Sequence, residues 1–313
     1  MAKLFESELI LLFNRFDEAS KKIWNSFLQC GYKLDCIVFE NNGFLPDGVY
    51  SIFDCFSNCK KEELPTAPLD IYKLQVPELW RVSTFGNKAE IFDGEIEKGR
   101  VGLKEYNGYR CVEYIDWLDY KGKRLYRENY DKTGKVKSRK IYMQDGTELS
   151  TVYYDHMGDE VVTEIKQDGK YIIHNKGIDK IVNSLPGLAA EFIIQYGLAN
   201  RRFLINSLHH PFRALTKVHT HYSGDILFWQ ENIDDEIPIR LQSILNRKNA
   251  FITTIFSDKM SSYEKIMSAN EHDILIKYKG YVYPSMSEDG EAVELTENDD
   301  NMPENEFISD FNL

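Results

Sequence analysis

The chain has 313 residues, of which 42% are hydrophobic and 28% charged, a composition that fits one large or two ordinary globular domains and excludes disordered and fibrous proteins. Its 38 Lys and Arg residues against 50 Asp and Glu residues give a net charge of −12, so a protein that binds nucleic acid is not expected. The apolar stretch from Leu9 to Phe13 is far shorter than the roughly 20 residues of a membrane-spanning helix. No signal-peptide cleavage pattern follows it, and five cysteines, an odd number, fit reduced thiols, so we expect a cytoplasmic protein.

Residues 1–60 predict the first part of an α/β domain. Asp17 is suited to cap a helix whose apolar residues recur at four-residue spacing until Gly31, and Cys36 to Phe39 predict a buried strand. The polar, proline-containing segment at 59–68 (CKKEELPTAP) then indicates a domain boundary.

A glycine repeat dominates the middle of the chain. The spacings are 12, 12, 12 and 11 residues between Gly122, Gly134, Gly146, Gly158 and Gly169. Three of these glycines end an Asp-x-x-Gly motif, in which Asp caps its own backbone and Gly supplies the left-handed conformation of a hairpin turn. With the Tyr-, Val-, Ile- and Arg-rich segments between them, these turns predict an antiparallel β-meander inserted at residues 61–184.

The predicted meander carries two features that suggest partners. Val136 to Tyr142 has few large apolar residues, so we expect the sheet to be largely exposed. Residues 121–140 hold nine basic and two acidic residues, either as charge that protects a sheet edge or as a docking face for an acidic partner or an anionic membrane. We predict that a partner covers one edge and a tyrosine-rich face that includes Tyr130, Tyr142 and Tyr154.

Residues 185–284 predict the remainder of the α/β domain. Pro186 opens a helix that runs to Tyr196, after which continuous apolar strands alternate with amphipathic helices. The expected strands are 203–205, 226–229, 251–256 and 274–278, and the expected later helices are 235–245 and 263–267. This alternation indicates a parallel sheet with both faces covered. Residues 285–313 hold ten acidic residues and no basic one, which predicts a flexible acidic tail.

A search for catalytic or ligand-binding motifs is negative. Neither glycine-rich phosphate-binding pattern occurs, so nucleotide binding has no local support. Cys55 and Cys59 have metal-ligand spacing but lack a second pair, and we expect buried thiols and neither metal nor cofactor. Four histidines follow a predicted strand: His209, His210, His219 and His221. We expect them to be surface residues and not catalytic groups, because no partner that would orient them can be identified in the sequence. The carboxylates Asp234, Asp235 and Glu236 are expected to cap the next helix.

Several long segments together resemble the GtfB family, the glycosyltransferase-stabilising proteins of the accessory Sec system. The resemblance runs in order across about residues 10–283 and is carried by 12–21 (LFNRFDEASK), 37–48 (IVFENNGFLPDG), 76–80 (VPELW), 114–119 (YIDWLD), 205–207 (INS), 225–231 (DILFWQE) and 235–238 (DEIP).

The resemblance implies a non-catalytic subunit that pairs with a catalytic glycosyltransferase subunit of GtfA type. In the family, this pair transfers N-acetylglucosamine from UDP-GlcNAc to Ser and Thr of serine-rich-repeat adhesins at the cytoplasmic face of the cell membrane, before export. The resemblance further implies a Rossmann-like domain of GT-B N-terminal type, a role in holding the acceptor polypeptide, and subunit association through the inserted sheet.

The C-terminus departs from the family pattern. An acidic tail begins after Pro284, where a second Rossmann-like domain is expected, so we expect that domain to be absent. Catalytic relatives have two glutamates eight residues apart, and here that spacing occurs at Glu97 and Glu105 within the strand-rich insert, where chance explains it. Two alternatives remain open, a catalytic glycosyltransferase of the same superfamily and a shortened docking module without effect on glycosylation.

Overall fold

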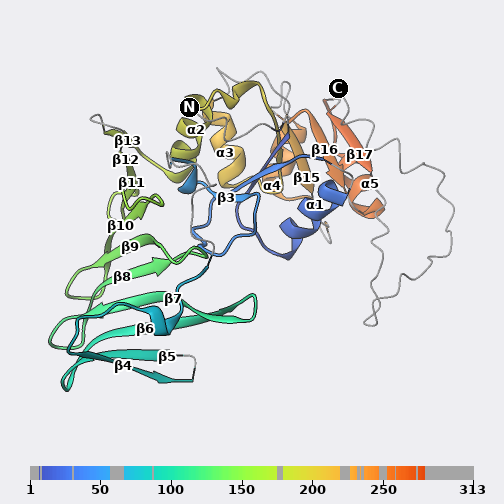
Figure 1. The fold of residues 1–313 in the computed structure, drawn as a ribbon. Coiled ribbons are helices and arrows are strands. Elements are labelled where there is room, and N and C mark those ends of the chain that lie inside the picture. Colours follow the sequence, from blue (N-terminus) through green and yellow to red (C-terminus); the bar gives the residue numbers. More distant parts are fainter. Residues whose placement is uncertain are drawn as a thin grey trace, which may run out of the picture.

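The computed structural model describes residues 7, 9–29, 32–56, 67–86, 88–174, 179–218, 226–230, 233, 236–246, 252–257, 259–272 and 274–278. Within these ranges the protein is a mixed α/β structure with one parallel and one antiparallel sheet (Figure 1). None of the described helices is both long and apolar enough to cross a membrane. The acidic segment 285–313, predicted to be a tail, lies outside the described residues.

The parallel sheet has seven strands within the described residues, in the order β17-β16-β15-β14-β1-β2-β3. They are β1 (Leu9–Phe13), β2 (Asp35–Val38), β3 (Val49–Ser51), β14 (Arg202–Ile205), β15 (Ile226–Gln230), β16 (Thr254–Ser257) and β17 (Leu275–Tyr278). The central strand β1 is buried on both faces, which explains its unbroken run of apolar residues. The apolar stretch at Leu9–Phe13, recognised from the sequence only as too short for a membrane helix, is therefore a core strand.

Helices cover both faces of this sheet. They are α1 (Glu18–Gln29), α2 (Leu185–Gln195), α3 (His210–Val218), α4 (Ile239–Leu245) and α5 (Met260–Ser268), with single-turn helices at Asp54–Phe56, Ile71–Lys73 and Leu198–Asn200. Ile23 and Phe27 of α1 pack on the face formed by Leu11 and Val38. The other helices contribute to the second core on the opposite face, which contains Ile10.

Local signals predicted the starts of α1 and α2, whereas α4 and α5 begin at Ile239 and Met260 and not at 235 and 263. Asp17 caps α1, because its carboxylate accepts the N–H of Ser20 at 2.9 Å. The expected helix at 235–245 was too long, since α4 begins only after Pro238, which occupies the N-cap position. Asp234 and Asp235, expected to cap it, lie outside the described residues. Helix α3 is not among the helices that the sequence predicts.

The antiparallel sheet has ten described strands, in the order β13-β12-β11-β10-β9-β8-β7-β6-β5-β4, so each pairs with the next along the chain. They are β4 (Trp80–Phe85), β5 (Lys88–Asp93), β6 (Ile96–Tyr106), β7 (Tyr109–Leu118), β8 (Arg124–Tyr130), β9 (Val136–Tyr142), β10 (Glu148–Tyr154), β11 (Glu160–Ile165), β12 (Lys170–Ile173) and β13 (Lys180–Val182). All five repeat glycines have positive φ, between 62° and 90°, which confirms the predicted turns.

This sheet is less exposed than expected. At the end next to the α/β domain, Tyr153, Val162 and Ile173 belong to the same core as the parallel sheet. Toward the other end of the sheet lies a third, smaller core around Ile91 and Val112. Residues of the segment that precedes β4 cover it. The strands β4 and β5 lie at the end of the sheet farthest from the α/β domain (Figure 1).

Candidate functional site

The two sheets meet where the loop after β2 touches the β8–β9 turn. A Cβ atom at Gly43 would lie 2.5 Å from the carbonyl oxygen of Tyr130, so only glycine permits this approach. The backbone N–H of Lys132 donates to the carbonyl of Gly43 at 3.0 Å. The Lys132 ammonium also donates to the carbonyl of Leu45 and to Asp47, both at 2.7 Å. The turn is thereby fixed to the α/β domain.

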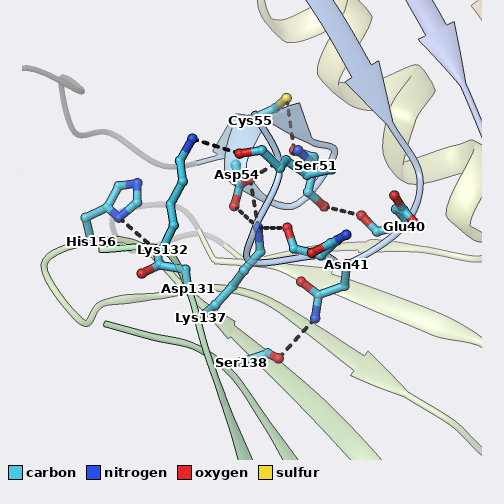
Figure 2. Close-up of polar contacts among 12 residues, drawn as sticks. Glu40, Asn41, Ser51, Asp54, Cys55, Asp131, Lys132, Lys137, Ser138 and His156 are labelled. Atoms are coloured by element: carbon cyan, nitrogen blue, oxygen red, sulfur yellow. Dashed lines mark hydrogen bonds and ion pairs between the residues drawn. The ribbon is translucent and has the colours of Figure 1, made fainter. Parts of the chain in front are cut away.

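A buried lysine makes the second connection (Figure 2). Lys137 is 7% exposed, and its ammonium lies 2.9 Å from both carboxylate oxygens of Asp54. The same ammonium donates to the carbonyl of Asn42 at 3.3 Å. Asp54 is held in place by the backbone N–H of Ser51 at 3.1 Å. This pairing compensates the cost of burying the lysine charge.

Further side-chain contacts extend the junction on either side of Lys137. Ser138 accepts a hydrogen bond at 3.0 Å from the amide of Asn41, in the α/β domain (Figure 2). It accepts a second one at 3.0 Å from the amide of Asn129, in the antiparallel sheet. Phe53 stacks on Tyr153 with ring centroids 3.7 Å apart and an interplanar angle of 3°. Because these contacts join residues of both sheets, they fix the orientation of one sheet relative to the other.

An open hollow of about 600 Å³ lies beside this junction, between residues 40–44 and the face of the antiparallel sheet that carries Tyr114 and Lys140, called here the inner face. Its lining is polar and comes from residues 40–44, from β6 to β10 and from the residue after β11: Glu40, Asn41, Asn42, Gly43, Phe44, Lys104, Glu113, Tyr114, Arg127, Asn129, Tyr130, Lys140, Thr151, Tyr153 and Lys166. Because one wall comes from the loop after β2 and the other from the antiparallel sheet, the hollow exists only while the junction holds the two together.

Ion pairs order the charged side chains of the hollow. The pairs are Lys104 with Glu113 at 3.4 Å, Arg127 with Asp116 at 2.7 Å, Lys140 with Glu148 at 3.4 Å and Lys166 with Glu164 at 2.8 Å. Burial raises the pKa of Glu148, but the hydrogen bond from Thr151 and the charges of Lys140 and Lys166 outweigh it and lower the pKa overall. The carboxylate therefore stays ionised, and the network is held by charge at neutral pH.

A second polar cluster lies where the order of the parallel strands reverses, between β1 and β14. Asn14 follows β1 and donates to the Ser207 hydroxyl at 2.8 Å, and Asn206 follows β14 and donates to the Ser20 hydroxyl at 3.0 Å. The side-chain oxygens of both asparagines are buried without a hydrogen-bond partner among the described residues. Both asparagines lie in segments that resemble the GtfB family, at 12–21 and 205–207, but no pattern in the sequence predicts a role for them. Strand ends at such a reversal are the usual ligand position in open α/β sheets.

The far edge of the antiparallel sheet is open. β4 pairs with β5 alone among the described strands, so the backbone groups on its outer side face no other strand. Phe85 is 89% exposed, and Leu79, just before the strand, is 88% exposed. The opposite edge strand, β13, has three residues and carries Ile181 at 63% exposure.

The three tyrosines predicted to bind a partner do not share one face. Tyr130 donates to Glu128 at 3.4 Å, and Arg139, which pairs with Glu128, lies over the ring of Tyr154. Tyr142 lies on the inner face, under the guanidinium of Arg124, which pairs with Asp116. All three are partly buried. Partner binding by these tyrosines stays a prediction.

The basic run at 121–140 is largely neutralised within the protein. Six of its nine basic side chains form ion pairs with carboxylates: Arg124, Arg127, Lys132, Lys137, Arg139 and Lys140. Two of these six pairs, those of Lys132 and Lys137, connect the sheet to the α/β domain. The run therefore stabilises the protein more than it presents a basic docking face, a role that neither sequence-based alternative included.

The other candidate groups show no catalytic arrangement within the described residues. His209 and His210 are exposed, whereas His219 and His221 lie outside the described ranges. Glu97 and Glu105 both lie on β6, and Glu97 pairs with Arg100. The described cysteines Cys36, Cys55 and Cys111 are buried thiols, as expected. No group of three potential metal-ligating side chains occurs in the part of the chain that the structure describes.

Domain models of one family match the chain in order. The GtfB N-terminal domain matches residues 10–56, the GtfB middle domain 80–183 and the GtfB third domain 187–269. The chain belongs to the GtfB family. The resemblance inferred from the sequence is thereby confirmed, and the middle-domain match spans the strands of the antiparallel sheet.

Curated GtfB relatives and a solved complex agree with this assignment. The chain is 29% identical to the Streptococcus agalactiae protein named UDP-N-acetylglucosamine–peptide N-acetylglucosaminyltransferase stabilizing protein GtfB, over 88% of this chain and 62% of that protein. It is 30% identical to the Streptococcus gordonii protein of the same name, over 88% and 61%. A crystal structure of a GtfA/B complex bound to UDP and GlcNAc contains a similar chain, with a TM-score of 0.72, 27% identity and coverage of 88% and 62%. The chain thus spans about three fifths of the length of these GtfB proteins.

Proposed function

We propose that the protein is the non-catalytic stabilising subunit of a two-component O-GlcNAc transferase that modifies Ser and Thr of serine-rich-repeat adhesins before accessory Sec export. The observation that carries the proposal is the continuous match, through both sheets, to proteins named as stabilising proteins of a peptide N-acetylglucosaminyltransferase. The solved complex with a similar chain supports a GtfA-type glycosyltransferase as the partner.

The β4 edge is the docking surface in this proposal. An open strand edge is a template for pairing with another chain, and proteins that do not use such an edge protect it with charge or proline. Among the six residues of β4, only Arg81 is charged and none is proline. The exposed Phe85 and Leu79 add apolar surface next to the unpaired backbone groups. The partner's sheet would pair with β4 and cover these side chains.

The α/β domain serves as the Rossmann-like, GT-B N-terminal unit that faces the acceptor. Its strand order, with a reversal between β1 and β14 and helices on both faces, supports this assignment. The unpartnered side-chain oxygens of Asn14 and Asn206 at the reversal support contact with a polar ligand. Because no phosphate-binding glycine loop occurs in the sequence, the donor nucleotide is assigned to the partner.

We place the complex at the cytoplasmic face of the cell membrane, where an adhesin awaits export. The neutralised basic run contributes little to membrane attachment in this proposal. Fractionation of cells that express both subunits, followed by immunoblotting of the membrane and soluble fractions before and after a high-salt wash, tests the placement. Recovery in the membrane fraction only when the partner is present is the expected result.

Co-expression with the catalytic subunit from the same gene cluster tests the proposed function. Size-exclusion chromatography with light scattering measures the complex, and transfer from UDP-GlcNAc to a serine-rich acceptor measures activity. We expect a stable complex and faster transfer than with the catalytic subunit alone. A complex without faster transfer would favour a docking module, whereas transfer by this chain alone would favour a catalytic enzyme.

A matched pair of variants tests the docking surface. Phe85→Glu places a charge on β4, and Ile181→Glu places the same charge on the opposite edge strand. Loss of a central aromatic contact weakens binding by about 2 kcal/mol or more, about 30-fold in the dissociation constant. We expect this loss for Phe85→Glu alone. Equal binding by both variants would exclude β4 as the docking edge.

A further inference from the structure

The hollow between residues 40–44 and the inner face of the antiparallel sheet has no assigned role. We infer that it binds a neutral, hydroxyl-rich segment of polypeptide, which makes it a second contact for the acceptor besides the strand ends at Asn14 and Asn206. The inference rests on the proposed function for the identity of the polypeptide. The location of the site and the chemistry of its ligand follow from the residues that line the hollow.

The charge of the lining argues for a neutral ligand. Each of the four cations at the hollow pairs with a carboxylate of the same sheet face. Asp116 also pairs with Arg124, but Glu40 on the other wall adds a further carboxylate, so no surplus positive charge is left for a phosphate. Glu40, on the other wall, accepts the backbone N–H of Phe16 at 3.0 Å. Nucleotide sugars and phospholipid headgroups, which need surplus cations, therefore do not fit this lining.

The hydrogen-bonding groups argue for hydroxyls and amides. A lysine ammonium carries three donors. Lys104 and Lys140 lie 3.4 Å from their carboxylates, which is long for a charge-assisted hydrogen bond, so each has donors to offer a ligand. The amides of Asn41 and Asn42 and the ring of Tyr114 complete a surface of neutral polar and aromatic groups. Ser and Thr side chains and peptide groups match such a surface in both donors and acceptors.

The position and size of the hollow suit an extended chain. Glu40 to Phe44 follow the carboxyl end of β2, the strand next to β1, so the hollow adjoins the edge of the sheet that carries Asn14. A volume of about 600 Å³ falls in the range of ligand sites. An acceptor that leaves the strand ends of the parallel sheet can thus continue across the inner face of the antiparallel sheet.

Fluorescence anisotropy with a labelled, uncharged Ser/Thr-rich peptide tests the inference on the full chain in complex with the catalytic subunit. Lys140→Glu replaces a cation of the hollow and sets two carboxylates against each other at Glu148. Lys135→Glu makes the same charge change on the same hairpin, at an exposed position outside the hollow. We expect about tenfold weaker peptide binding for Lys140→Glu, the loss of one hydrogen bond to a charged group, and unchanged binding for Lys135→Glu.

Equal peptide affinities in the two variants would overturn the inference. Binding of a Gly/Ala peptide of the same length with the same affinity as the Ser/Thr-rich peptide would also overturn it, because the hollow would then not recognise hydroxyl groups. Displacement of the peptide by millimolar GlcNAc alone would also overturn it, in favour of a sugar site. If the Lys140→Glu variant does not assemble with the catalytic subunit, Tyr114→Phe, which removes one hydroxyl only, replaces it in the test. This variant is expected to bind the peptide about threefold more weakly, which is within the range of one net hydrogen bond between neutral groups. Unchanged peptide affinity of the Tyr114→Phe variant would overturn the inference.

The same samples separate this inference from the proposed function. Light scattering reports the complex, and anisotropy reports the peptide. Failure to form any complex refutes the proposed function, and peptide binding is then measured on the chain alone. If the Lys140→Glu variant forms a normal complex and binds the peptide as tightly as the wild type, the hollow is not the peptide site, and the proposed function is unaffected.

Discussion

Replacement of the buried lysine by methionine, Lys137→Met, is expected to destabilise the protein by about 2–3 kcal/mol. Removal of one partner of a buried ion pair costs about 3–5 kcal/mol, because the remaining charge is left uncompensated. Asp54 has 28% of its side chain exposed and keeps the N–H of Ser51, so the remaining charge is partly solvated and the expected cost lies at or just below the lower limit of that range. The carbonyl of Asn42 also loses its donor. Urea unfolding followed by tryptophan fluorescence measures the change in free energy.

A double-mutant cycle with Asp54→Asn assigns this energy to the pair. We expect the double variant to be more stable than the sum of the single changes predicts, with a coupling energy of about 1.5–3 kcal/mol. Lys135→Met removes an exposed lysine of the same hairpin and serves as the control, with a change within about 0.5 kcal/mol. A Lys137→Met variant as stable as this control would refute the view that the Lys137–Asp54 pair holds the two sheets together.

Three further predictions concern single side chains. Gly134→Val is expected to lower the free energy of unfolding in urea more than Gly146→Val does. Both glycines have positive φ, which costs about 1–3 kcal/mol for other residues, so this cost is common to the two variants. Only at Gly134 would the new Cβ atom also lie 3.0 Å from the backbone nitrogen of Leu69. Partial burial of the otherwise exposed His210 ring, which stacks on Phe39, and then the charges of Arg213 and His209 lower the pKa of His210 from 6.5. The unfolded chain therefore takes up its proton at higher pH than the folded one, and the free energy of unfolding should fall as pH drops below about 6.5. His210→Gln should flatten the dependence of this free energy on pH, and an unchanged dependence would contradict the assignment to His210. Phe53→Ala removes the ring stacked on Tyr153 and should cost about 3–5 kcal/mol, whereas Phe53→Leu, which keeps most of the apolar volume, should cost clearly less. A Phe53→Leu variant as stable as the wild type would show that the stack contributes nothing beyond apolar volume, and equal losses in the two variants would contradict the expected order.

The sequence predicted features that depend on neighbouring residues. The turn at Gly134 needs only Asp131 and a residue free to adopt positive φ, and both are visible as an Asp-x-x-Gly motif. The cap at Asp17 is equally local. These signals located the inserted antiparallel sheet and the start of α1 without tertiary information.

Features that depend on distant residues were missed. Gly43 followed a predicted strand in an unremarkable loop, and its role arises from contact with Tyr130, 87 positions later. The twelve-residue spacing suggested one common face for Tyr130 and Tyr142, yet register shifts next to Tyr130 and between Glu148 and Ser150 interrupt the alternation of side chains along the strands. Equal spacing along the chain therefore fixed the turns but not the faces.

The connectivity of the two sheets has a consequence for folding during synthesis. Every strand from β4 to β13 pairs with its neighbour in sequence, whereas the parallel sheet requires Leu9 to meet Arg202 across the whole insert. Contacts close in sequence form early, and distant ones must first bring the chain ends together. We expect the antiparallel sheet to fold while the ribosome is still producing the second half of the α/β domain. During that interval the apolar residues of β1 and β2 are exposed, because their partner strand β14 has not yet been synthesised. We expect the yield of folded protein to depend on how well this first part of the α/β domain is protected from aggregation.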